Sequence, residues 1–184
     1  MGKDLTSSQI DRLNILSNNY ALQHIYEELD YKSFLFEGKY RYSKQQVAFY
    51  YSVDLRTIER VLESNKNEIE RSGYEILTGV RLRKYKEEFL KHITALNLRH
   101  VPDKNVGNMS YDFDNELDSL NKTPQLGIFT FKGFLNIGML LTGAERAQNL
   151  RSIVLDIVID VMNEKLGGNS KYINQEVKIF CLAL

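Results

Sequence analysis

Two arginines lie four residues apart in the segment RTIER, at Arg56 and Arg60, and Thr57 follows the first of them. Residues four apart on a helix lie on the same side of it, so the two guanidinium groups can point in one direction. A guanidinium donates two parallel hydrogen bonds, which match the acceptor pair on a guanine edge or the oxygens of a phosphate. These residues therefore suit contact with nucleic acid if they lie on an exposed helix.

Side chains suited to other chemistry do not gather in the sequence. Asp156 and Asp160 share one face of an expected helix, a spacing that metal or acid–base sites can use. Charges at this spacing are more often a solvated stripe or partners for basic residues. The other candidate ligands are scattered, without zinc-site spacing, at His24, His92, His100 and Cys181. We therefore expect no enzyme activity, no metal and no cofactor.

The two arginines fall in the second of two short segments with helical periodicity, which together run from 42 to 62. A helix-turn-helix needs a small residue where its helices touch, apolar residues around the turn and a branched apolar anchor in the second helix. The chain supplies these at Val47, Ala48, Tyr51, Val53, Ile58 and Val61. Ser52 stands where a glycine with positive φ is usual, and Asp54 is expected to cap the second helix. An ordinary pair of core helices with a solvated arginine face is the alternative.

The charges on the chain are balanced overall but not locally. The sequence has 24 basic and 24 acidic residues, so any case for nucleic acid depends on where the charges lie. Residues 39–62 carry five basic and two acidic side chains, and residues 80–104 carry seven and three. Phosphate contact needs a basic face rather than a basic protein. The candidate DNA-binding residues are Arg56, Thr57 and Arg60, with backbone contacts expected from Lys44, Arg81, Arg83 and Lys84.

Residues 1–100 are expected to form the helix-turn-helix DNA-binding region. Ser7 or Ser8 can cap a helix that continues to about Leu29. The stretch FLFEGKYRY predicts a short β-hairpin, because its glycine can take the positive φ of a tight turn. A second hairpin is expected over YEILTGVRL, before a long helix that begins near Arg81.

Residues 101–125 hold both prolines and a local run of acidic residues, which predicts a linker or surface loop between two halves. The second half, 126–184, is expected to begin with a strand over GIFTF and a helix over 133–141. A long helix over 144–166 follows, apolar on nearly all sides. Such a helix must be buried by its own domain or by a partner chain, so this half is a candidate for dimerisation. The expected fold class is mainly α, of the α+β type.

One segment of the second half resembles a known family. In GIFTFKGFLNIGMLLTGAERAQNLRSIVLDIVI a strand ends in Phe-Thr, an apolar helix containing glycine follows, and Glu-Arg-Ala opens a long apolar helix. This pattern is similar to the amino-terminal domains of phage antirepressors of the KilA and Bro type and to virulence-associated RhuM-like proteins. The likeness covers about 35 residues, with matching positions at Phe129, Thr130, Gly133, Leu140, Gly143, Glu145, Arg146, Ala147 and Ile153. The resemblance implies a bacterial or phage DNA-binding protein, with the helix-turn-helix placed as in RhuM-like proteins.

Composition places the chain among ordinary globular proteins, with 43% hydrophobic and 26% charged residues in 184. A single cysteine suits a reducing cytoplasm, the first residues lack a secretory signal, and no apolar run approaches the roughly 20 residues of a membrane-spanning helix. We therefore expect a cytoplasmic regulator of transcription that binds double-stranded DNA as a homodimer in a bacterium, a phage or a mobile element. The alternative is a protein-interaction module, antirepressor-like or antitoxin-like, that acts by binding another regulator.

Overall fold

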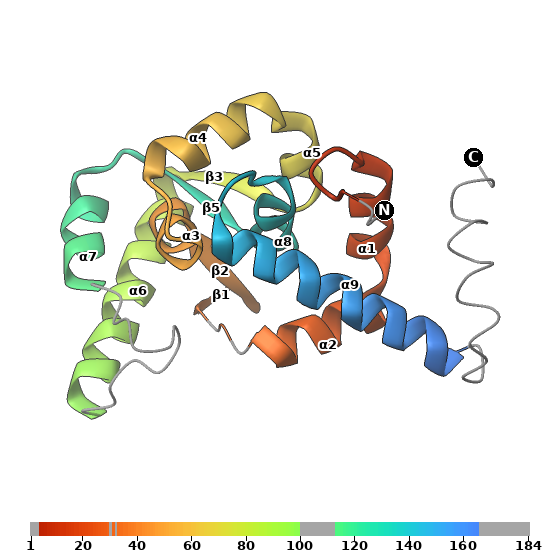
Figure 1. The fold of residues 1–184 in the computed structure, drawn as a ribbon. Coiled ribbons are helices and arrows are strands. Elements are labelled where there is room, and N and C mark those ends of the chain that lie inside the picture. Colours follow the sequence, from red (N-terminus) through yellow and green to blue (C-terminus); the bar gives the residue numbers. More distant parts are fainter. Residues whose placement is uncertain (1–3, 30, 32, 100–112, 166–184) are drawn as a thin grey trace.

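The structure, a computed structural model, describes residues 4–29, 31, 33–99 and 113–165. The described chain is mainly helical with one small antiparallel sheet, so the predicted α+β class is confirmed. The helices are α1 (Gln9–Ser17), α2 (Asn19–Leu29), α3 (Lys44–Tyr51), α4 (Leu55–Ser64), α5 (Lys66–Arg71), α6 (Gly79–Arg99), α7 (Phe113–Lys122), α8 (Phe131–Leu140) and α9 (Glu145–Lys165). The strands are β1 (Phe34–Phe36), β2 (Lys39–Ser43), β3 (Tyr74–Thr78) and β5 (Gln125–Phe129) (Figure 1).

The strands form an antiparallel sheet in the order β1-β2-β5-β3. β1 and β2 are the hairpin predicted over FLFEGKYRY, in which Phe34 pairs with Arg41. The second predicted hairpin is wrong, because β3 pairs with β5 and the chain after Thr78 enters α6 directly. Leu82 and Tyr85 are buried and spaced for a helix, which favours helix over strand at this point.

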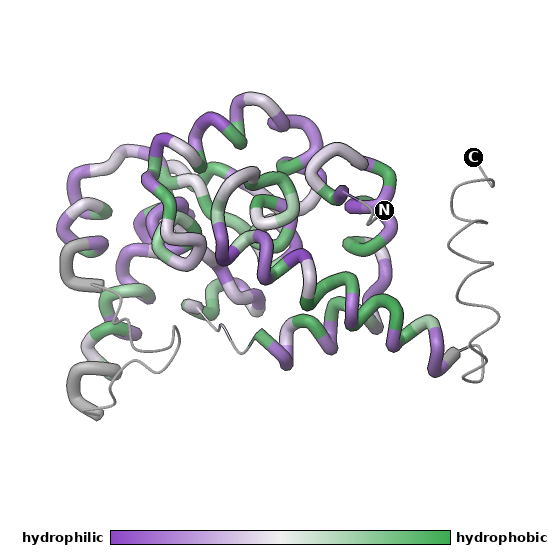
Figure 2. Tube along the Cα trace, in the orientation of Figure 1, coloured by the Kyte–Doolittle hydropathy of each residue, from purple (hydrophilic) through white to green (hydrophobic). Residues whose placement is uncertain are grey.

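Helices cover both faces of the sheet (Figure 1). α6 and α7 lie on one face, where Tyr85 packs edge to face on Phe34 of β1. α3 and α8 lie on the other face, where Phe134 stacks on Tyr42 of β2 with ring centroids 4.9 Å apart. Figure 2 shows hydrophobic residues along α2 and α9, which lie side by side, and mostly hydrophilic residues on α4. The sheet is therefore buried between two separate hydrophobic cores.

The sheet joins strands from both sides of the predicted linker at 101–125. β5 lies between β2 and β3, so the second half of the sequence supplies the strand that links the strands of the first half. The loop expected over 113–125 is corrected, because these residues form α7, a short turn and the start of β5. Leu120 of α7 is buried in the same core as α6, which holds this helix against the protein. Residues 101–112 and 166–184 lie outside the described residues.

The predicted first helix is two helices. Ser8 caps α1, as expected, by accepting a hydrogen bond from the Asp11 backbone N–H. The helix breaks at Asn18, whose backbone is extended and whose side-chain oxygen accepts a hydrogen bond from the Ala21 backbone N–H. Asn18 thus starts α2 as a capping residue. Periodicity missed the break because the apolar spacing continues across it.

The long helix of the second half is α9, and α8 precedes it close to the predicted bounds. α9 packs on α2, α3 and α8, with Ala147, Leu150, Val154 and Val161 buried. The chain itself therefore covers most of this apolar surface, so burial of α9 does not require a partner, and the homodimer stays a prediction. No helix in the described part of the chain is long and apolar enough to cross a membrane.

Candidate nucleic-acid interface

α3 and α4 are joined by a short turn, from Ser52 to Asp54. Ser43 and Gln46 close a capping box at the start of α3, where each side chain accepts a hydrogen bond from the other's backbone N–H. α3 ends at Ser52, whose backbone is left-handed with φ 53° and ψ 44°. The Val53 backbone N–H then bonds to the Ala48 carbonyl at 3.0 Å. The serine thus takes the positive φ that glycine usually supplies at this position.

The contact between these two helices is apolar and buried. Ala48 is 6% exposed and Ile58 is fully buried, as the pattern requires, while Val61 is only partly buried. Behind them, the Tyr51 hydroxyl donates a hydrogen bond to the Phe134 carbonyl of α8 at 3.0 Å. α4 contacts both α3 and α8, so its position is fixed from two sides.

The outward face of α4 carries both arginines. A helix turns by about 100° per residue, so residues two before and two after the buried Ile58 point away from the protein. These residues are Arg56 and Arg60, and both are exposed. Neither forms an ion pair with any residue that the structure describes. The two guanidinium groups therefore share one exposed stripe, with Glu63 beyond them on the same side.

Asp54 fixes the first turn of α4. Its carboxylate accepts hydrogen bonds from the Thr57 backbone N–H at 2.7 Å and from the Thr57 hydroxyl at 3.2 Å. These bonds, with a smaller contribution from the charge of Arg60, hold the pKa of Asp54 below its usual value. Thr57 is therefore part of the cap, and Leu55, 37% exposed, is the apolar residue that begins the helix.

Lys44 lies beside α4 but is already paired. Its ammonium nitrogen is 2.8 Å from a carboxylate oxygen of Glu59. Glu59 occupies a flank of α4 between the two arginines in sequence, so the ion pair offsets a negative charge next to them. Lys44 thus offsets one of the two negative charges that α4 carries, at Glu59 and Glu63.

The other predicted contacts lie on α6, which covers the opposite face of the sheet from α3 and α4 (Figure 1). Arg81 binds two carboxylates, those of Glu37 at 2.6 Å and Glu75 at 2.8 Å, and these bonds raise its pKa above the usual value. Arg83 and Lys84 are exposed. The structure does not bring these three residues together with the arginines of α4.

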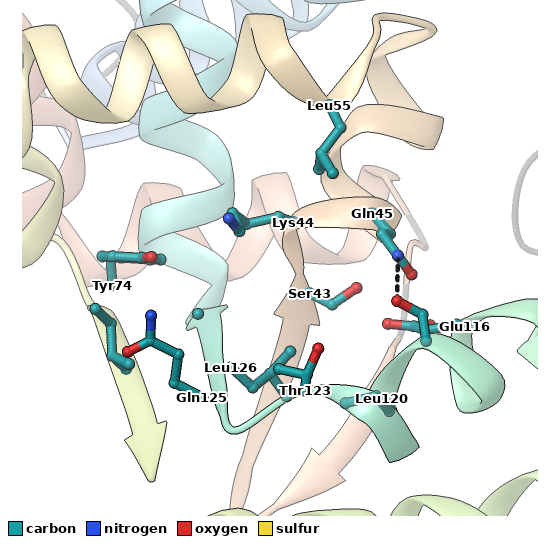
Figure 3. Close-up of a pocket in the computed structure, with 13 residues that line it drawn as sticks. Ser43, Lys44, Gln45, Leu55, Tyr74, Glu116, Leu120, Thr123, Gln125 and Leu126 are labelled. Carbon is teal, nitrogen blue, oxygen red and sulfur yellow. Dashed lines mark hydrogen bonds between the residues drawn. The ribbon is translucent and has the colours of Figure 1, made fainter.

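A cavity of about 220 Å³ lies beside the start of α4 (Figure 3). Its walls come from the beginning of α3, the first residue of α4, strands β3 and β5, and α7. Sequence reasoning missed this pocket, because its residues come from separate segments and a loop is predicted where α7 lies. The helical spacing of Phe113, Leu117 and Leu120 is the signal that could have revealed α7.

No three His, Cys, Asp or Glu side chains gather to hold a metal ion among the residues that the structure describes. Asp156 and Asp160 are exposed on α9. His100 and Cys181 lie outside the described residues. The geometry that stands out is therefore the exposed arginine stripe of α4, with the pocket beside it.

The chain matches no protein-family model, and no curated protein and no solved structure matches it. The resemblance of residues 127–159 to antirepressor and RhuM-like proteins therefore stays a prediction from the sequence. The choice of α4 as the candidate interface therefore depends on its own geometry. Its exposed arginines are chemically suited to contact with nucleic acid.

Proposed function

We propose that the chain binds double-stranded DNA through α4, which enters the major groove as the recognition helix of a helix-turn-helix. The observation that carries this proposal is the exposed stripe of Arg56 and Arg60, opposite the buried Ile58 of a helix held by α3 and α8. The biological role that follows is regulation of transcription in a bacterium, a phage or a mobile element, which the sequence resemblance implies.

The position of each side chain on α4 indicates its part in the contact. A helix in the major groove directs its outermost residues at base edges and its flanks at the phosphates of the groove walls. Arg56 and Arg60 are outermost, so we assign them to base edges, where an arginine pairs with O6 and N7 of guanine. Thr57 lies towards one flank, where its hydroxyl can reach a phosphate only by leaving the Asp54 carboxylate.

The ion pair between Lys44 and Glu59 favours this approach to DNA. An unpaired carboxylate on the flank of α4 would repel the phosphates. Lys44 lies 2.8 Å from the Glu59 carboxylate and offsets its charge, so Lys44 contributes to affinity without touching DNA. We assign α6 no part in this contact, because it lies on the opposite face of the sheet. The predicted contact residues on α6 are Arg81, Arg83 and Lys84.

Fluorescence anisotropy with labelled duplexes, over a series of salt concentrations, tests the proposal. We expect affinity to fall steeply with salt, because cationic side chains displace counterions from the phosphates. The double variant Arg56→Ala with Arg60→Ala should lose sequence preference and at least about tenfold in affinity for the preferred duplex. Circular dichroism spectra should match the parent, because both side chains are exposed.

The matched control is Arg83→Ala with Lys84→Ala, which also removes two exposed positive charges. We expect this variant to bind like the parent, within about twofold. An equal loss in both double variants would contradict the assignment to α4. Absent binding, or binding that does not respond to salt, would contradict DNA recognition and favour the protein-interaction module.

A further inference from the structure

The first turn of α3 is bonded to both α4 and α7. Lys44 forms the ion pair with Glu59 of α4, in which nitrogen and oxygen are 2.8 Å apart. The carboxamide of Gln45 donates a hydrogen bond to the Ser119 hydroxyl of α7 at 3.3 Å, which Figure 3 shows as a dashed line. A displacement of α7 would therefore act on the turn that also contacts α4.

A second bond from this turn to α7 is buried. The carboxamide nitrogen of Gln46 donates to a carboxylate oxygen of Glu116 at 3.1 Å. The two residues are 1% and 2% exposed. A buried polar group that loses its partner costs more free energy than an exposed one, because bulk water cannot replace the lost bond. The bond between Gln46 and Glu116 is therefore the one more able to hold the turn.

The oxygen of the same Gln46 carboxamide closes the capping box of α3. It accepts hydrogen bonds from the Ser43 backbone N–H at 3.1 Å and from the Ser33 hydroxyl at 2.7 Å. The Ser43 N–H can only donate, so it requires the oxygen on its side and leaves the nitrogen facing α7. Glu116 supplies the acceptor that this nitrogen needs. The carboxylate of α7 therefore completes the set of bonds that keeps the capping box closed.

The capping box fixes the start of a short helix. α3 has eight residues, or about two turns, so a shift of its first turn displaces much of the helix. Ala48, at the buried contact between α3 and α4, comes only two residues after Gln46. α4 carries the exposed Arg56 and Arg60. The position of both arginines thus depends on the start of α3.

We propose that Glu116 is a positioning residue for DNA recognition: it orients the Gln46 carboxamide, which holds the first turn of α3 and thereby the arginines of α4. This inference rests on the proposed function. Glu116 is 2% exposed, so it does not itself contact DNA. Loss of a negative charge alone would strengthen binding to a polyanion, so weaker binding after its removal would indicate the positioning role.

Amide hydrogen exchange of the full chain, followed by NMR, tests the orientation without DNA. Glu116→Leu removes the acceptor, so the backbone N–H groups of Ser43 and Gln46 should exchange about tenfold faster. The N–H groups of Leu150 and Val154, buried on α9, are the internal reference and should change less. A protein that was merely less stable would exchange faster by the same factor at all four positions.

Swapping the two side chains is the sharper test, because it keeps the net charge. Gln46→Glu alone places an oxygen opposite the Glu116 carboxylate, so it should speed exchange at Ser43 at least as much as Glu116→Leu does. The double variant Gln46→Glu with Glu116→Gln again sets a donor against an acceptor, and glutamate suits a capping box as glutamine does. Its exchange rates and DNA affinity should return to within about threefold of the parent.

Fluorescence anisotropy with the preferred duplex measures the effect on recognition. Glu116→Leu should lower affinity by about threefold to tenfold. Glu116→Gln should bind within about twofold of the parent, because its carboxamide oxygen can still accept from Gln46. The matched control is Ser119→Ala, which removes the exposed bond of the same helix and should also stay within about twofold.

The inference would be overturned if exchange at Ser43 and Gln46 did not change more than the reference, or if the double variant were no better than Gln46→Glu alone. A parent that binds no duplex would contradict the proposed function, and the role in recognition with it. A parent that binds DNA and a Glu116→Leu variant that binds equally well would contradict this inference alone.

Discussion

Ser52 has a backbone conformation that residues other than glycine rarely adopt. Its φ of 53° is one of two positive values at non-glycine residues in the described chain. The left-handed conformation costs an L-residue about 1 kcal/mol or more, and glycine avoids this cost. We therefore expect Ser52→Gly to raise the free energy of unfolding by about 0.5–1 kcal/mol, measured by urea denaturation followed by circular dichroism.

The matched control for this change is Ser152→Gly, at an exposed position inside α9. Glycine in a regular helix should lower the free energy of unfolding there, by about 0.5 kcal/mol. A decrease at both positions would show that the Ser52 side chain stabilises the turn by more than its conformation costs.

Arg12 and Glu68 form a buried ion pair that joins α1 to α5. Their side chains are 4% and 5% exposed, and the guanidinium donates to both carboxylate oxygens at 2.7 Å. Arg12 also donates to the Leu5 carbonyl at 2.6 Å. Replacement of the arginine leaves a buried carboxylate without its counter-charge, so Arg12→Met should lower the free energy of unfolding by about 3–5 kcal/mol.

The double variant Arg12→Met with Glu68→Leu should lose less stability than Arg12→Met alone, because no buried charge then lacks a partner. Urea unfolding of the parent, both single variants and the double variant gives the coupling energy of the pair. If the losses in free energy of unfolding of the two single variants added up to the loss of the double variant, a direct interaction between the two charges would be contradicted.

Residues of the segment that resembles antirepressors have packing roles in this structure. A Cβ on Gly138 would collide with the Tyr51 hydroxyl, so the glycine lets α8 approach α3. Arg151 donates to two carbonyls near the end of α8, at 2.6 and 3.0 Å. Arg146 donates to the Tyr50 carbonyl at 2.9 Å, near the end of α3. Both arginines therefore stabilise helix ends, where a positive charge is favourable.

At the scale of elements, the proposed function predicts which DNA α4 binds, because the spacing of its two arginines is fixed by the helix. Arg56 and Arg60 are about 6 Å apart along the helix axis at 1.5 Å per residue. Base pairs stack about 3.4 Å apart, so the two side chains reach bases roughly two steps apart. We expect duplexes selected from a random pool to share two guanines at about this spacing. Replacement of either guanine by 7-deazaguanine should weaken binding about threefold to tenfold.

The matched comparison uses the arginine variants on the same duplexes. Arg56→Ala should remove the sensitivity to one substituted guanine and Arg60→Ala the sensitivity to the other, because 7-deazaguanine lacks the N7 acceptor. This prediction rests on the proposed function. Sensitivity that survives in both variants would assign the arginines to phosphates instead.

Short-range patterns predict several helices well. The bounds of α8 and α9 lie within about two residues of the predicted ones, and Asp54 caps α4 as expected. Each of these elements carries its own apolar spacing and its own start signal. The partner of β3 could not be predicted in this way, because β5 lies far along the chain and short-range spacing does not relate distant strands.

The candidate site likewise has features that the sequence could predict and features that it could not. The outward direction of Arg56 and Arg60 could be predicted, because their offset from a buried Ile58 sets it. The carboxylates that bind Lys44 and Arg81 could not, because they lie on other elements whose packing depends on the whole fold. The cavity beside α4 could not be predicted for the same reason.

At the scale of the whole molecule, the positions of α3 and α4 depend on residues beyond the predicted linker. Phe134 of α8 stacks on Tyr42 and on Tyr51, with ring centroids 4.9 and 5.2 Å apart. β5 pairs with β2 on one side and with β3 on the other. The second half of the sequence thus supplies α8 and β5, the elements that hold α3 and α4 in position.

This shared sheet predicts that the chain unfolds in one cooperative transition. Urea curves from far-ultraviolet circular dichroism and from the fluorescence of the 11 tyrosines should coincide. A fragment of residues 1–100 should show no cooperative transition, because it lacks β5, the strand between β2 and β3, and the Phe134 ring that fills the core behind α3. Addition of a 101–184 fragment should restore structure. Such recovery would show that the 1–100 fragment fails to fold because it lacks contacts and not because it is chemically damaged. If residues 1–100 alone unfolded with a midpoint near that of the parent, the first half would be an independent domain, and the sheet would join two domains that fold separately.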